Sequence, residues 1–124
     1  MSTFKSSLPI THIGTATTVI ENDGVNFLTD PVFAVAGAKY DLGVAVLESN
    51  RGPAIKLTET PPIDAVLLSH KDHPDNIDKL GRQLLEARKV ITTIDGVKKL
   101  APRPGVHGIK PWKTSKAQCW WKII

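Results

Sequence analysis

The sequence predicts an α/β fold, in which helices are layered on a β-sheet. Three observations support this. Two segments rich in β-branched residues stand near the start, a continuous apolar run follows at residues 65–68, and short strand and helix patterns alternate after it. Strands that alternate with helical patterns are typical of a layered sheet with parallel strands. With 124 residues, 41% of them hydrophobic, the chain is long enough for one domain with one core.

The first predicted element is a β-hairpin. Residues 9–13 and 16–20 are rich in β-branched side chains, which favour extended segments. Asp23-Gly24 predicts a tight turn, because this pair tolerates the positive φ of hairpin turns. Residues 25–29 predict the returning strand. It ends at Asp30-Pro31, since proline has no N–H to donate to a strand ladder.

A long connection follows over residues 32–62. Its glycines and prolines predict irregular structure, with Ala45-Val46-Leu47 packing locally. Beyond it, residues 63–69 predict a strand that is buried on both faces. Four further elements follow from periodicity: a helix over 76–87 with apolar residues at Ile77, Leu80, Leu84 and Leu85, a strand over 89–93, a short helix over 95–100 and a strand over 106–109.

Composition and charge exclude several classes of protein. No apolar run approaches the roughly 18 residues of a membrane-spanning helix. Residues 1–8 lack the apolar core of a signal peptide, and the single Cys119 excludes an internal disulfide, so we expect a cytoplasmic protein. Residues 1–97 hold 9 Lys and Arg against 12 Asp and Glu, whereas residues 98–124 hold 7 Lys and Arg and no acid. These basic residues stand singly among Pro, Gly and Trp, a pattern of a solvated tail rather than of a nucleic-acid-binding surface.

The candidate functional residues lie directly after the buried apolar run. The segment Ser69-His70-Lys71-Asp72-His73-Pro74-Asp75-Asn76 has two histidines and two aspartates within six residues. Imidazole and carboxylate are ligands that Zn²⁺ takes from proteins, and α/β sheets place ligand sites where strands pass into loops. We therefore expect His70, His73 and Asp75 to bind a metal ion. Asp75, and after it Asp72, could orient a water molecule or accept a proton. The same segment would also make a polar turn and helix cap.

Three motifs in this order carry a family resemblance: Thr11-His12-Ile13-Gly14-Thr15-Ala16-Thr17, Leu28-Thr29-Asp30-Pro31-Val32-Phe33 and Asp64-Ala65-Val66-Leu67-Leu68-Ser69-His70. Together they resemble the metallo-β-lactamase superfamily, in its lactonase and N-acylphosphatidylethanolamine phospholipase D-like branch. The resemblance covers residues 9 to 113. It implies that residues 1–113 form the N-terminal half of an αββα sandwich, followed by an atypical basic and aromatic tail at 114–124.

The resemblance also implies a site for one or two metal ions, usually zinc, with the signature His-x-His-x-Asp-His. If Lys71 is an insertion, His70, His73 and Asp75 match this signature in order, and Asn76 replaces its last histidine. Without an insertion, only His70 matches. Asp30 matches an aspartate that supports the metal-binding loop by hydrogen bonding. A histidine placed like His12 can line the mouth of the site.

The function implied by the resemblance is hydrolysis of an ester, lactone, thioester or phosphodiester by a metal-bound hydroxide. The family places three further metal ligands in its second half, and this chain has no histidine after His107 and no acid after Asp95. We therefore expect a truncated hydrolase that is weak or inactive. The alternative is a non-catalytic binding or regulatory fragment. Either kind of fragment would leave one face of the sheet open, with Val66, Leu67 and Leu68 partly exposed. A second copy of the chain or a partner protein could cover this face.

Overall fold

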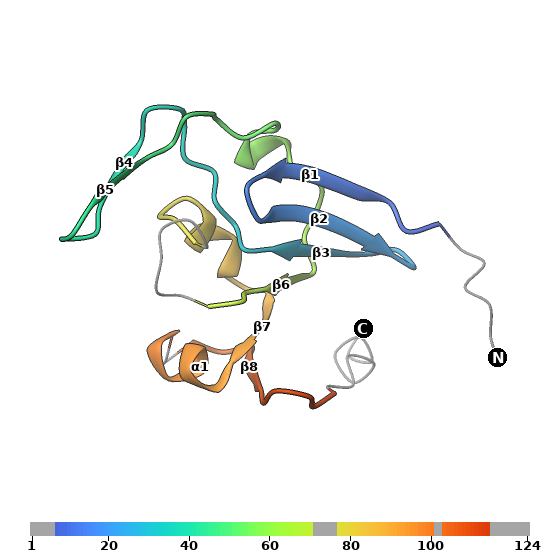
Figure 1. Ribbon diagram of the computed structural model, residues 1–124. Helices are drawn as coiled ribbons and strands as arrows, with labels where there is room; N and C mark the ends of the chain where they lie inside the picture. The colour runs from blue at the N-terminus through green and yellow to red at the C-terminus, as the bar shows by residue number, and fades with distance from the viewer. Residues whose placement is uncertain (1–6, 71–76, 101–102, 115–124) are drawn as a thin grey trace.

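The computed structural model describes residues 7–70, 77–100 and 103–114. Six strands form its main sheet: β1 (Ile10–Gly14), β2 (Thr17–Asn22), β3 (Val25–Thr29), β6 (Ala65–Leu67), β7 (Lys89–Thr93) and β8 (Val106–Ile109). Their order in space is β1-β2-β3-β6-β7-β8 (Figure 1). Neighbours are antiparallel from β1 to β3 and parallel from β3 to β8. The predicted α/β class is confirmed.

The predicted hairpin is present as β2 and β3. The turn between them is Asp23-Gly24, with φ of 49° and 77°. Positive φ at both central residues is the geometry of a type I′ turn, whose twist matches that of the flanking strands. The turn sets the register, in which Ile20 faces Phe27 and Val19 faces Leu28.

The connection between β3 and β6 is more regular than the sequence suggests. It contains a two-stranded hairpin, β4 (Lys39–Asp41) and β5 (Val46–Glu48), and a 3₁₀ turn, η1 (Leu57–Glu59). The prediction that Ala45-Val46-Leu47 packs locally is wrong, because Val46 and Leu47 are 61% and 40% exposed. The two strands are joined by a turn at Gly43, whose N–H donates to the Asp41 carboxylate at 2.8 Å. The side chains of β5 face solvent rather than a local core.

The helix predicted over residues 76–87 is wrong for the part that the structure describes. Residues 81–85 form a 3₁₀ turn, η2 (Gly81–Leu85), rather than an α-helix. The reason is a contact from far along the chain. The backbone of Gly81 lies so close to Pro31 that any side-chain carbon at Gly81 would collide with the Pro31 carbonyl. The Asp78 carboxylate accepts the N–H groups of Phe33, at 2.8 Å, and Gly81, at 2.7 Å, and so binds the two segments together.

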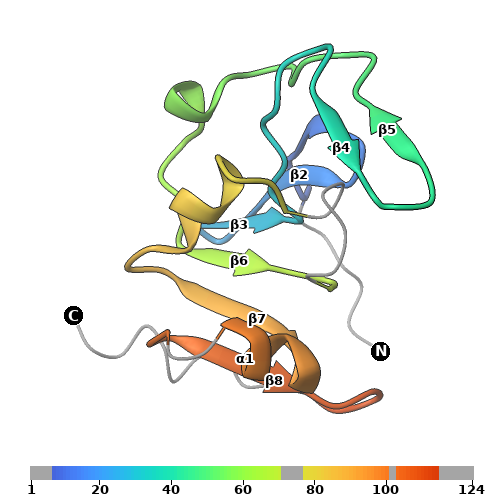
Figure 2. The ribbon, with the colours of Figure 1, turned by 90° about the vertical axis from the view of Figure 1, so that its left-hand side faces the viewer.

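The described helical elements η2 and α1 (Ile94–Leu100) lie on one face of the sheet, in front of it in Figure 2. The core fills the space between, and the strands contribute Val19, Leu28, Val66 and Val90, each at most 1% exposed. The opposite sheet face carries half-buried apolar side chains, and within the described chain neither η2 nor α1 covers it. We call this the open face; its apolar residues are Ile20, Phe27, Leu67, Ile91 and Ile109.

Partial exposure is predicted for three residues of the central strand, Val66, Leu67 and Leu68. This is correct for Leu67 alone. Leu67 is half-buried, whereas Val66 and Leu68 are 0% and 2% exposed. Successive strand residues point to opposite faces, so Val66 and Leu68 reach the covered side and only Leu67 reaches the open face. None of the described helices has the length and hydropathy needed to cross a membrane.

Candidate metal centre

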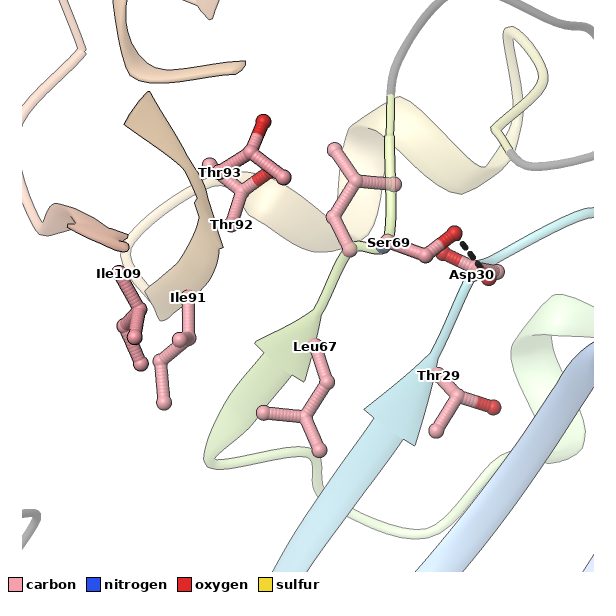
Figure 3. Close-up of a pocket in the computed structure, with 9 residues that line it drawn as sticks. Thr29, Asp30, Leu67, Ser69, Ile91, Thr92, Thr93 and Ile109 are labelled. Atoms are coloured by element: carbon pink, nitrogen blue, oxygen red, sulfur yellow. Dashed lines mark hydrogen bonds between the residues drawn. The ribbon is translucent and has the colours of Figure 1, made fainter. Parts of the chain in front are cut away.

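Two of the predicted residues meet where β3 and β6 end. These strands are parallel, and Thr29 lies opposite Leu67. The chain therefore leaves both strands at the same edge of the sheet, with Asp30 beside Ser69 (Figure 3). The Asp30 N–H donates to the Leu67 carbonyl at 3.0 Å, which extends the ladder by one bond. This is the edge at which α/β sheets bind ligands.

A chain of hydrogen bonds links Asp30 to His70 through Ser69. Asp30 Oδ1 accepts the Ser69 N–H at 2.7 Å, and Oδ2 accepts the Ser69 hydroxyl at 2.8 Å. Ser69 Oγ lies 3.0 Å from His70 Nδ1. A carboxylate has no proton to give, so the only hydroxyl proton of Ser69 goes to Asp30. His70 Nδ1 is then the donor to Ser69, and in the neutral tautomer with this hydrogen bond the lone pair lies on Nε2.

The backbone of Asp30 is held in an uncommon conformation. Its φ is 31°, in the left-handed region that costs a non-glycine residue of order 1–3 kcal/mol, and the residue is 7% exposed. Thr17 maintains this conformation, because its hydroxyl donates to the Asp30 carbonyl at 2.6 Å and accepts the Val32 N–H at 3.0 Å. The result is a buried carboxylate aimed at Ser69. Strain of this kind concentrates at functional sites.

A cavity of about 350 Å³ opens beside these residues, at the edge of the open face (Figure 3). Asp30 and Ser69 supply polar groups on one side, and the remaining wall is formed by Leu68 and by apolar and threonine side chains of β3, β6, β7 and β8. The cavity could bind the apolar part of a small molecule next to the Asp30–Ser69–His70 chain. Its full lining is Thr29, Asp30, Leu67, Leu68, Ser69, Ile91, Thr92, Thr93 and Ile109.

The other predicted site residues are not brought to this point by the described chain. His73, Asp75 and Asp72 lie outside the described residues, and their roles stay predictions. His12 is exposed on the edge strand β1, separated from β6 by β2 and β3, and its Nε2 lies 3.0 Å from the Thr15 carbonyl. It takes no part in the Asp30–Ser69–His70 chain, so its role at the mouth of the site also stays a prediction. Over residues 7–70, 77–100 and 103–114, no three metal-ligating side chains gather.

Sequence reasoning missed the part played by Ser69 and Thr17. Ser69 is hydrogen-bonded to both Asp30 and His70, and so links the carboxylate to the imidazole. Thr17 holds the backbone of Asp30 in its positive-φ conformation by a hydrogen bond to the Asp30 carbonyl. Both belong to the three motifs quoted above. The role of Ser69 could have been predicted from its position, because a hydroxyl residue directly before a histidine at a strand end can hydrogen-bond to that histidine. The role of Thr17 depends on the pairing of β2 with β3, and no local pattern reveals it.

No protein-family model matches the chain. A Caenorhabditis elegans protein, N-acyl-phosphatidylethanolamine-hydrolyzing phospholipase D 1, is 33% identical over 109 residues, which cover 87% of this chain and 27% of the relative. An uncharacterized protein of Mycobacterium tuberculosis is 36% identical over 73 residues, which cover 59% of this chain and 19% of that protein. The crystal structure of isothiocyanate hydrolase from Delia radicum gut bacteria matches 82% of this chain and 41% of its own, with a TM-score of 0.65 and 24% identity.

This chain is part of a metallo-β-lactamase-superfamily domain. The worm relative supports the sequence resemblance, and the isothiocyanate hydrolase shows the fold. The worm relative is a hydrolase by name, so the predicted resemblance to a hydrolase is confirmed at that level. Relatives in this superfamily are generally zinc-dependent. The metallo-β-lactamase-like chain described here spans less than half the length of each of these relatives.

Proposed function

We propose that this metallo-β-lactamase-like chain supplies one wall of the metal site of a hydrolase. The observation that carries the proposal is the Asp30–Ser69–His70 chain of hydrogen bonds. It fixes the imidazole in the tautomer whose Nε2 can coordinate a metal ion, an arrangement common behind metal-ligating histidines. The histidines and aspartates between His70 and Asp75 suit Zn²⁺, which accepts imidazole and carboxylate ligands.

His70, His73 and Asp75 would hold the zinc ion. When bound, zinc supplies a water molecule acidic enough to give hydroxide near neutral pH. The chain's own residues have separate tasks. Ser69 and Asp30 orient the His70 ring, while Asp75 or Asp72 orients a water molecule or accepts its proton. If Asp75 serves as the proton acceptor, only His70 and His73 remain as ligands, one fewer than the three usual for catalytic zinc, and the activity of this chain alone would be weak.

The substrate class we propose is a small molecule with an ester, lactone, thioester or phosphodiester group. The name of the worm relative describes action on an N-acylated phospholipid, and that of the solved relative describes hydrolysis of isothiocyanates. The apolar cavity beside Asp30 and Ser69 has room for part of such a molecule. A cytoplasmic location agrees with the single cysteine and with the absence of a spanning helix from the described chain.

Zinc analysis of the purified 124-residue chain tests this proposal. After dialysis against dilute zinc and then buffer, we expect close to one zinc ion per chain, measured by plasma mass spectrometry. His70→Ala should remove most of it. Asp30→Asn should weaken zinc affinity by about 10–100-fold, because the ring loses the anion that orients it through Ser69.

The matched control is His12→Ala, which removes an exposed histidine from the far side of β2 and β3. Its zinc content should equal that of the wild type. A wild-type chain without zinc, or equal zinc in wild type and His70→Ala, would contradict the metal site. Circular dichroism of each variant checks that the fold is retained.

The second function we propose is pairing with another protein layer through the open face. The observation that favours it is the row of half-buried apolar side chains on β2, β3, β6, β7 and β8, opposite the helical face. Exposed apolar rows of this kind mark interaction surfaces in soluble proteins. In this alternative the chain is a binding fragment without catalysis.

A further inference from the structure

A second, polar cavity lies at the free edge of the sheet, away from Ser69 and His70. It has a volume of about 600 Å³. One side is the end of β1 with the turn that follows it, and the other is the loop between β5 and η1, which passes over β1 in Figure 1. The residues that line it are His12, Ile13, Gly14, Thr15, Ser49, Asn50, Arg51, Gly52 and Ala54.

The loop that carries Arg51 is fixed at both ends by backbone hydrogen bonds. On one side, the Ser49 N–H donates to the Ala38 carbonyl at 2.8 Å. On the other, the Ala54 N–H donates to the Ile13 carbonyl of β1 at 2.8 Å. Between them, the Ser49 hydroxyl donates to the Arg51 carbonyl at 2.8 Å. The loop is therefore ordered in advance, which lowers the entropic cost of binding a ligand there.

The lining of this cavity suits an anion. Arg51 brings a guanidinium group, and no carboxylate occurs among the described residues that line the cavity. Asn50 and Thr15 add amide and hydroxyl groups that can donate hydrogen bonds. The five N–H donors of arginine form a rigid fork that matches the oxygens of a phosphate group in pairs.

We propose that this cavity binds a phosphate group, with Arg51 as its main ligand. Neither the metal site nor the open face is needed for this. The cavity nevertheless lies at the same end of the sheet as Asp30, because β1 ends at the edge where β3 ends. The strand order β1-β2-β3-β6 places it three strand spacings, or roughly 14 Å, from Ser69. A phosphate bound there could anchor one end of a ligand whose other end reaches the Asp30–Ser69–His70 chain.

Titration of the ¹⁵N-labelled chain with inorganic phosphate, followed by NMR, tests the proposal. We expect saturable shifts in the amides of Thr15, Asn50 and Gly52 and in the Arg51 side chain. Arg51→Gln should weaken binding at least tenfold, which corresponds to about 1.4 kcal/mol. The phosphate affinity of Arg51→Lys should lie between those of the wild type and Arg51→Gln, because lysine keeps the charge but cannot donate two parallel hydrogen bonds. Arg82→Gln, at an exposed arginine of η2, is the matched control and should bind phosphate as the wild type does.

Three results would overturn the proposal. One is equal affinity in Arg51→Gln and wild type, and another is a lack of saturable shifts in this cavity. The third is loss of phosphate binding with a chelator or in His70→Ala, since the anion would then sit on the metal ion. That last result would leave the proposed metal site standing, so the two proposals fail separately.

A further arm distinguishes free phosphate from a phosphate ester. Gly52 also borders a neighbouring cavity of about 610 Å³, whose lining includes Val35, Leu57 and Leu80. A short alkyl phosphate that binds more tightly than inorganic phosphate, with added shifts at Leu57 and Leu80, assigns the site to a phosphate ester. Equal affinity for both probes assigns it to free phosphate. Acetate is the charge control and should bind more weakly than either.

Discussion

At the scale of single residues, one carboxylate illustrates how a turn motif and a functional motif differ. Asp-Pro is a common way to end a strand, and the sequence supports both a turn and a supporting role for Asp30. The structure adds that both carboxylate oxygens of Asp30 are occupied by Ser69, and that Asp30 adopts a costly positive φ. Some turns also use positive φ, but an Asp-Pro turn does not need both carboxylate oxygens to accept hydrogen bonds from one distant residue. The arrangement is explained if the orientation of the next residue, His70, matters.

Tyr40 is the only tyrosine of the chain, and its ionisation can be followed without interference from another. Its hydroxyl is buried and has no hydrogen-bond partner among the described residues. Burial, and after it the negative charge of Asp78, raise the pKa of Tyr40 above its ordinary value of 10.0. We expect the ultraviolet absorbance of tyrosinate to appear at a higher pH in the folded chain than in urea.

The sign of the effect on stability follows from this shift in pKa. The folded chain prefers the neutral phenol, so this contribution to stability is complete below the unfolded pKa and is lost as pH rises through the folded pKa. Tyr40→Phe should remove this pH dependence. Near neutral pH it should change stability by less than about 1 kcal/mol, because the hydroxyl gives up no hydrogen bond. An ordinary Tyr40 pKa in the folded chain would contradict the buried position of the hydroxyl.

At the scale of elements, the contact between Gly81 and Pro31 makes a specific prediction. Gly81→Ala forces a methyl group against the Pro31 carbonyl, next to Asp30. We expect a loss of stability of about 3 kcal/mol or more, since backbone cannot give way as a flexible side chain does. Gly14→Ala is the control, because a methyl group there meets nothing within 4 Å. In urea denaturation it should leave stability unchanged or raise it by about 0.5 kcal/mol, because alanine restricts the unfolded chain more than glycine does. Similar midpoints for the two variants would show that η2 does not pack on Pro31.

The same contact explains which elements could be predicted from the sequence. The strands at 89–93 and 106–109 have the predicted bounds, and the Asp23-Gly24 turn has the predicted geometry, because strand propensity and turn chemistry are local. The 3₁₀ turn at 81–85 was not predicted, because the Asp78 carboxylate accepts the backbone N–H of Phe33, 45 residues away in the sequence. Of the four apolar residues in this pattern, Ile77, Leu84 and Leu85 are buried, whereas Leu80 is 39% exposed.

At the scale of the whole molecule, the described helical elements η2 and α1 cover one face of the sheet and leave the other uncovered. The helical face has a core of fully buried side chains, whereas the open face has apolar side chains that keep contact with solvent. The fold class could be predicted from motifs, whereas the roles of His73, Asp75 and Asp72 stay predictions. The open face could be anticipated only from the resemblance, because alternation along a strand does not tell which of two apolar faces is covered. The relatives, which are longer than the region matched, agree with a fold that continues beyond this layer.

The open face therefore predicts concentration-dependent association of the isolated chain, in which the open faces of two copies pack as stacked sheets. Burying half-exposed Leu67, Ile91 and their neighbours yields roughly 25 cal/mol per Å² of apolar area, enough for a weak dimer over a standard interface. Sedimentation velocity over a range of concentrations should show the shift from monomer to dimer. Leu67→Asp should abolish it, because each dimer would bury two unpaired carboxylates. Val46→Asp, at a 61% exposed position on β5, should leave it unchanged. A wild-type chain that stays monomeric at every concentration, with a cooperative melt, would contradict self-association through the open face and leave a different protein layer as its partner.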